Sequence, residues 1–144
     1  MPTKWQGAVI VAVLAYVAAT VYFYQLETAV NPMGVTKEII KAGNGPTPTK
    51  GASVTVHCTG YGKDRDLSQK FWSTKDPGQQ PFQFQVGLGN VIRGWDEGVL
   101  SMALGEVARL TCSPDYAYGA RGFPAWGIQP DSVLVFEIEV LKIE

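Results

Sequence analysis

The stretch from Val91 to Val99 constrains the fold more than any other part of this 144-residue sequence. It carries apolar side chains at the spacing of one helical face, which predicts a helix over residues 93–102. Asp96 and Glu97 stand at the start of this predicted helix, where the positive end of its dipole favours acidic groups. On spacing alone the helix belongs to a core, with a buried tryptophan on its apolar face. That face comprises Ile92, Trp95, Val99 and Met102.

The segments around this helix have the pattern of short strands separated by turns. The clearest alternation lies near the end of the chain, where Leu134, Phe136, Ile138 and Val140 share one face and two glutamates occupy the other. Further strands are predicted over residues 35–40, 52–61, 81–86 and 107–112. These elements favour an α+β architecture, in which an antiparallel sheet folds over one helix.

Composition and motifs exclude several classes of function. The sequence has 12 basic and 13 acidic residues and no basic cluster, which argues against nucleic acid as a partner. One histidine, His57, and two cysteines, Cys58 and Cys112, are too few for a zinc site of ordinary ligand number. No serine lies beside a plausible histidine base, and no Gly-rich phosphate loop precedes a helix. We therefore expect neither a metal nor another cofactor.

The interval from Trp5 to Leu26 contains no charged residue. As a helix it is long enough to cross a bilayer core of about 30 Å, and aromatic residues stand at both of its ends. This pattern predicts a transmembrane helix over residues 1–26, a linker over 27–34 and a domain over 35–144. A cleaved signal peptide and a helix buried in the domain are the alternatives.

Small residues line one side of this predicted anchor. Ala8, Ala12, Ala15 and Ala19 recur at spacings that place them on one helical face, where they would permit close approach of a neighbouring transmembrane subunit. The other interpretation is that alanine is common in such helices. If the face is real, the protein is a docked subunit of a larger membrane assembly.

A second block, from Ser113 to Ala120, follows the predicted helix and reads SPDYAYGA. Together with the first block it resembles the FKBP-type peptidyl-prolyl cis-trans isomerases, the macrolide-binding immunophilins. The resemblance runs from Met33 to the end of the chain. Residues 69–74 and 122–128 resemble small single-domain members from plants and green algae, to which an anchor has been added. The resemblance implies an antiparallel half-barrel sheet wrapped over one short helix.

The resemblance also implies a proline-binding pocket that works without a nucleophile. Trp95 would form its floor, and the Ile92 N–H and the Tyr118 hydroxyl would bind ligand carbonyls. Phe71 and Phe136 would complete the catalytic set. The remaining walls would be Phe82, Val91, Phe123, Trp126 and Ile128.

Two residues of this chain depart from the family pattern. Trp72 stands where most relatives carry an aspartate that orients the tyrosine, and Cys58 replaces a tyrosine on the pocket side. Both are included in the predicted substrate-binding set. We expect proline-containing polypeptides as clients, a reduced but retained activity, and weaker binding of macrolides than is usual.

The family fold implies that the strands of Cys58 and Cys112 are neighbours. A disulfide between them would suit an oxidising compartment. The alternative is two buried free thiols that behave as small hydrophobic side chains.

These features predict a membrane-anchored prolyl isomerase that assists the folding or assembly of clients. The alternative is a structural accessory subunit of a respiratory or photosynthetic membrane complex. The predicted location is an organelle membrane, the mitochondrial inner membrane or the thylakoid, entered through residues 5–26. The domain would face the intermembrane space or the lumen.

Overall fold

The computed structural model describes residues 14–19 and 34–144, and the chain divides into two units, 1–31 and 32–144. Within the first unit, residues 14–19 are helical and exposed. Most of the predicted membrane helix lies outside the described residues, as do Ala8 and Ala12, whereas Ala15 and Ala19 are exposed on the described turn of helix. No helix within the described ranges is long and apolar enough to cross a membrane.

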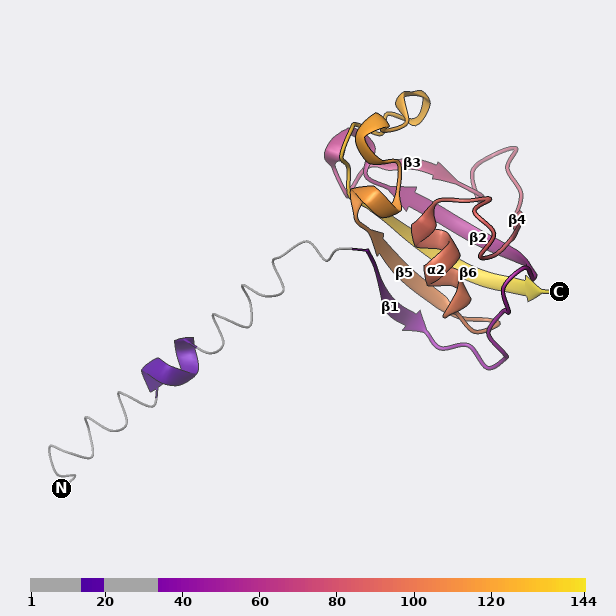
Figure 1. Cartoon of the computed structure of the whole chain (residues 1–144), viewed down its shortest axis with the longest axis horizontal. Coiled ribbons are helices and arrows are strands. Elements are labelled where there is room, and N and C mark those ends of the chain that lie inside the picture. Colours follow the sequence, from indigo (N-terminus) through magenta and orange to yellow (C-terminus); the bar gives the residue numbers. More distant parts are fainter. Residues whose placement is uncertain (1–13, 20–33) are drawn as a thin grey trace, which may run out of the picture. The chain divides into compact units, whose positions relative to one another are not determined.

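The second unit is built on an antiparallel sheet of six strands (Figure 1). Their spatial order is β1-β5-β6-β2-β3, and β4 pairs with the other half of the same β2 edge. The strands are β1 (Val35–Lys41), β2 (Ser53–Tyr61), β3 (Lys70–Ser73), β4 (Phe82–Gln85), β5 (Val107–Cys112) and β6 (Leu134–Ile143). The predicted α+β fold, an antiparallel sheet with one short helix, is confirmed.

The helix α2 (Arg93–Leu100) lies across one face of this sheet (Figure 1). Alternate residues of the strands point at it, because side chains in a strand alternate between the two faces. Trp95, Val99 and Met102 are buried, as the helical spacing predicts. Leu134, Phe136, Ile138 and Val140 on β6 are buried as well, so the predicted inward face of this strand is confirmed.

The segment between β5 and β6 contains three short 3-10 turns instead of a regular element. They are η2 (Pro114–Tyr116), η3 (Gly119–Arg121) and η4 (Pro124–Trp126). In Figure 1 this segment lies at the end of the sheet beside β3. A fourth short turn, η1 (Lys63–Arg65), connects β2 with β3. These turns carry or support much of the candidate site.

The prediction that Cys58 and Cys112 lie on neighbouring strands is wrong. Cys58 is on β2 and Cys112 on β5, and β6 runs between these strands. Two strand spacings are about 10 Å, whereas a disulfide requires Cα atoms within about 7 Å. Both residues are buried free thiols, and burial raises the pKa of the Cys112 thiol to about 12. The disulfide is therefore absent, and both cysteines serve as small core residues.

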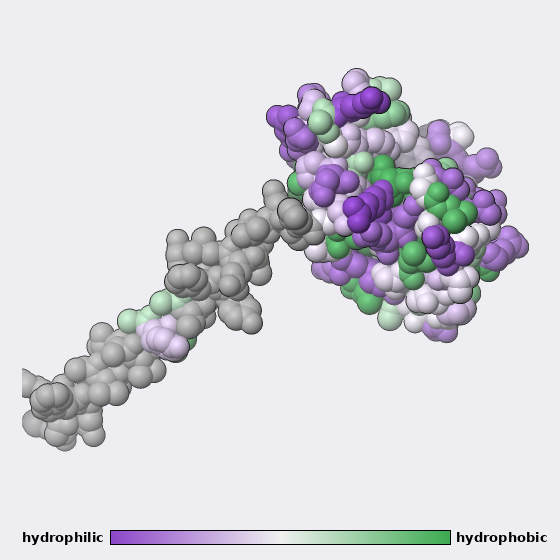
Figure 2. Space-filling view, in the orientation of Figure 1, coloured by the Kyte–Doolittle hydropathy of each residue, from purple (hydrophilic) through white to green (hydrophobic). Residues whose placement is uncertain are grey.

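The surface of the second unit is mainly hydrophilic or neutral in the view of Figure 2, with hydrophobic areas scattered among hydrophilic ones. Large apolar side chains at least one third exposed include Ile39 and Ile40 on β1, and Phe82, Phe123 and Trp126 near the helix. The last three belong to the candidate site described next.

Candidate functional site

An apolar pocket of about 320 Å³ opens beside the start of α2. Its walls come from β3, β4, β6, the loop before α2 and the turns between β5 and β6. The lining residues are Trp72, Phe82, Asn90, Val91, Ile92, Trp95, Tyr118, Trp126 and Phe136. A concave, mainly aromatic cavity with a few polar groups is typical of a small-ligand or peptide-side-chain site.

Trp95 forms the floor of this pocket. Its side chain is only 4% exposed, and its ring packs edge-on against Phe136 with ring centres 5.5 Å apart and against Phe82 at 5.9 Å. Phe84 lies against it at 5.5 Å. Among the described residues its indole nitrogen has no hydrogen-bond partner. The floor is therefore a rigid apolar plane held by aromatic neighbours on several sides.

The loop that leads into α2 is tied to the helix by Asp96. Its carboxylate accepts hydrogen bonds from the backbone N–H groups of Gly87 (2.9 Å) and Gly89 (2.7 Å). This contact holds the segment that carries Val91 and Ile92. The sequence indicates Asp96 as a helix-start residue, and the fold gives it this second role, for which local spacing contains no signal.

Two hydrogen-bond donors on the pocket wall are unused in the described part of the chain. The Ile92 carbonyl accepts bonds from the first turn of α2, but its N–H has no partner there. The Tyr118 hydroxyl has none either, although its ring is half-buried. Burial first, and then the proximity of Cys58, raises the pKa of Tyr118, so the hydroxyl keeps its proton and can donate.

Trp126 forms the outer wall together with Trp72. The two indoles are parallel within 3°, with ring centres 5.9 Å apart. Phe71 stacks on Trp126 at 5.7 Å and meets Phe136 edge-on at 5.9 Å. Phe123 packs against Trp126 at 4.7 Å. The outer wall thus depends on contacts between β3 and the turns after β5.

The structure brings most, but not all, of the predicted site residues to this pocket. Phe71 and Phe123 lie behind the wall and do not line the cavity. Ile128, which pairs with Phe123, and Cys58 on β2 are both buried and do not line this cavity either. Asn90 does line it, and no sequence pattern distinguishes this loop residue beforehand.

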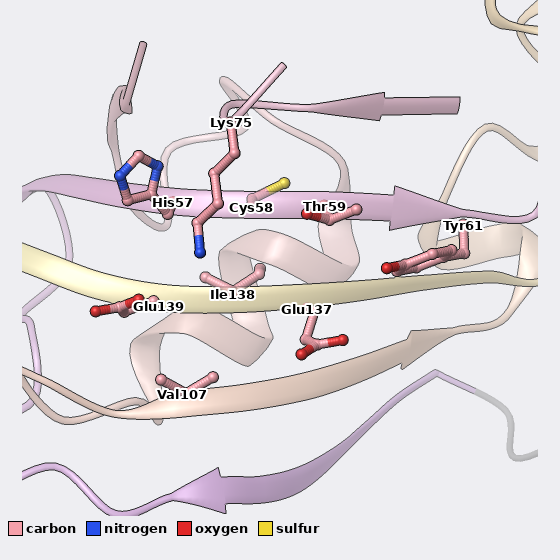
Figure 3. A pocket seen from close by; sticks show the side chains of 9 residues that line it. All are labelled: His57, Cys58, Thr59, Tyr61, Lys75, Val107, Glu137, Ile138 and Glu139. Carbon is pink, nitrogen blue, oxygen red and sulfur yellow. The ribbon is translucent and has the colours of Figure 1, made fainter. Parts of the chain in front are cut away.

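A second, polar groove lies on the opposite face of the sheet from α2 (Figure 3). Figure 3 shows Lys75 reaching over β2 toward β6, between His57 and Thr59, with two glutamates on β6. The His57 Nδ1 and the Thr74 hydroxyl are 2.9 Å apart. The lining residues are His57, Cys58, Thr59, Tyr61, Lys75, Val107, Glu137, Ile138 and Glu139. With charges of both signs and an open shape, this groove provides a control surface for experiments on the aromatic pocket.

Comparison with known proteins gives a family and several relatives. Residues 45–141 match a family described as "FKBP-type peptidyl-prolyl cis-trans isomerase". The chain is 76% identical over 112 residues to a protein of Vicia faba and 72% identical over 112 residues to one of Arabidopsis thaliana, both named "Peptidyl-prolyl cis-trans isomerase FKBP12". Both alignments cover 78% of this chain and 100% of the relative. "FK506-binding protein 1A" of Aspergillus fumigatus is 54% identical over 112 residues, which are 77% of this chain and 96% of that protein.

These relatives correct the predicted localisation. The two plant proteins are aligned over their whole length, so they carry no further segment that could correspond to a membrane anchor. The prediction of a single-pass protein in the mitochondrial inner membrane or the thylakoid, with its domain in the intermembrane space or the lumen, is therefore wrong. The accessory role in a membrane complex and the transmembrane partners gain no support either.

Proposed function

Because the chain belongs to the FKBP-type peptidyl-prolyl cis-trans isomerases, we propose that its aromatic pocket is the site at which this enzyme isomerises Xaa-Pro bonds. The observation that carries the proposal is a buried aromatic floor, Trp95, in a pocket whose lining also includes two donors without a partner in the described part of the chain, the Ile92 N–H and the Tyr118 hydroxyl. Proline-containing polypeptides are the proposed clients. Residues 35–144 are the proposed catalytic domain, and 27–34 the linker before it.

The pocket can lower the isomerisation barrier without a nucleophile. A prolyl amide resists rotation by about 18–20 kcal/mol because twisting removes its resonance. The twisted amide is less charge-separated than the planar one, so an environment without water favours the transition state. The proline ring would lie on Trp95, enclosed by Phe82, Val91 and Phe136. Phe71 and Phe123 would support the wall from behind.

The two donors would hold the substrate around the rotating bond. Carbonyl groups of the peptide would accept hydrogen bonds from the Ile92 N–H and the Tyr118 hydroxyl. A bond to the carbonyl that flanks the twisting amide fixes one side while the other side turns, and this contact is useful only if its geometry suits the transition state.

Replacing Tyr118 by phenylalanine tests this assignment. We expect kcat/KM on an Xaa-Pro peptide to fall about tenfold, because a hydrogen bond of about 1.4 kcal/mol is lost while the ring remains. The wild-type enzyme should keep a constant rate between about pH 6 and about pH 9, since the raised pKa of Tyr118 keeps the donor protonated there. A coupled peptide assay across this range measures both effects. A Tyr118→Phe enzyme as active as wild type would contradict the assignment, and so would an inactive wild-type enzyme.

Trp72 is the residue for a test of ligand affinity. We propose that a macrolide such as FK506 binds the pocket more weakly than is usual in the family, because Trp72 supplies no carboxylate to orient Tyr118. Trp72→Asp should tighten binding about fivefold, the effect of one further hydrogen bond of about 1 kcal/mol. Lys75→Asp, which adds a carboxylate on the polar groove of the other face, is the matched control. Equal or weaker binding by Trp72→Asp, measured by calorimetry, would contradict this explanation.

A further inference from the structure

A tight turn between β2 and β3 holds two consecutive residues in the left-handed region. Asp64 has φ 53° and Arg65 has φ 60°, and the Asp66 N–H donates to the Lys63 carbonyl at 2.9 Å. Positive φ at both central positions defines the type I′ turn, for which Asn-Gly is strongly preferred. An arginine in this conformation is unfavourable, because its Cβ crowds the backbone.

The turn is hydrogen-bonded to the segment that follows Trp126. The Asp64 N–H donates to the Gly127 carbonyl at 2.9 Å, and the Arg65 guanidinium donates to the Pro130 carbonyl at 2.8 Å. The Lys63 side chain lies against Gly127, where an added Cβ would come within 2.9 Å of the Lys63 Cγ. All of these contacts join residues more than 60 positions apart in the chain. The turn is therefore fastened to 127–130 by both main chain and side chain.

The segment bound by this turn, residues 127–130, adjoins the outer wall of the pocket. Phe123 and Ile128 exchange two backbone hydrogen bonds, of 2.9 and 3.1 Å, which close residues 123–128 into one unit. The Trp126 N–H donates to the Phe123 carbonyl within this unit at 3.0 Å. A displacement of Gly127 would consequently move the indole of Trp126 across Phe71 and Trp72.

We infer that Arg65 is a positioning residue for the isomerase site, which keeps Trp126 in place as the pocket wall. This inference rests on the proposed function of the pocket and names a determinant that lies outside it. The arginine is exposed and does not line the cavity. Its left-handed backbone is unfavourable in itself, but it aims the guanidinium at Pro130. Loss of the side chain should weaken substrate binding and leave the bond-rotation step, which depends on Trp95 and Tyr118, unchanged.

Three variants of the full chain separate the side chain from the backbone. Arg65→Gly removes the guanidinium and also the steric cost of the positive φ at position 65. Asp64→Gly removes the similar cost at position 64 while the Arg65 side chain stays. Arg65→Lys keeps a cation. We expect Arg65→Gly to raise KM about threefold to fivefold on an Xaa-Pro peptide with kcat unchanged, the effect of one exposed charge-assisted hydrogen bond. Amide hydrogen exchange in residues 122–131 should accelerate by a similar factor. Trp126→Ala should reproduce the rise in KM, and Arg65→Lys should restore part of the loss.

The readouts distinguish this inference from the proposed function. Amide hydrogen exchange in residues 122–131 reports on the contact between the turn and this segment, whether or not the enzyme turns over a substrate. If Arg65→Gly and Asp64→Gly show the same KM and the same exchange, the side chain has no positioning role. A fall in kcat without a change in KM would also overturn the inference. An inactive wild-type enzyme contradicts the proposed function, and the exchange data alone then decide whether Arg65 holds the loop.

Discussion

Trp95→Ala should bring isomerase activity close to the uncatalysed rate and lower the free energy of unfolding by about 3–5 kcal/mol. Both effects have one cause, because the 4% exposed indole is at once the pocket floor and a contact for Phe82, Phe84 and Phe136. Removal of the indole leaves a cavity, and the three neighbouring rings cannot fill it without giving up their present packing contacts. Urea unfolding and the peptide assay measure the two quantities.

The controls separate loss of the floor from loss of the fold. Trp95→Phe keeps an aromatic plane and should keep most of the activity with a smaller loss of stability. His57→Ala, on the polar groove of the other face, should change neither activity nor substrate affinity. A folded Trp95→Ala protein that isomerises peptides at the wild-type rate would refute the role of Trp95 as the floor.

The second large effect is expected at Gly94, where α2 meets the sheet. A Cβ at this position would collide with the Cys112 Sγ and would lie 3.0 Å from the Tyr116 carbonyl oxygen. Gly94→Ala should therefore lower the free energy of unfolding by about 2–3 kcal/mol. This value already includes the better helix propensity of alanine, which offsets only about 1 kcal/mol of the steric cost.

A double variant tests the cause of that loss. Cys112→Ala removes the sulfur that an alanine at position 94 would meet, so Gly94→Ala should cost less in the Cys112→Ala background than alone. Thermal unfolding of the two single variants and of the double variant gives the coupling energy. If the two changes are additive, the collision is not with Cys112, and the close packing of Gly94 needs another explanation.

Much of the fold follows from periodicity in the sequence. The helical spacing of Trp95, Val99 and Met102 and the alternation along β6 both predict burial that the structure confirms. Four further strands, β1, β2, β4 and β5, appear within one residue of their predicted bounds, whereas β6 continues to Ile143, beyond the alternation that ends at Val140. The four-residue strand β3 is missing from the prediction, because Lys70–Ser73 is too short to establish an alternation.

The site is less visible in the sequence, because its parts come from segments that are distant along the chain. Trp72, Tyr118 and Trp126 line the pocket, and only the resemblance to a family, not any local pattern, pointed to these aromatic residues. The supporting contacts of Asp96 with Gly87 and Gly89 could not be expected, since nothing local marks an acidic residue as a loop anchor. Asn90 escapes prediction for the same reason.

By itself the sequence determined which residues face inward, because the periods of helix and strand are local properties of the backbone. Tertiary structure alone decided which elements are neighbours. It placed β6 between the strands of Cys58 and Cys112 and left both thiols free. It also set the turn at Arg65 against Pro130, more than 60 residues away, and so fixed the wall that Trp126 presents to the pocket. Contacts of this kind depend on the order of the strands and the path of the loops, and one set of local sequence patterns is compatible with several such arrangements.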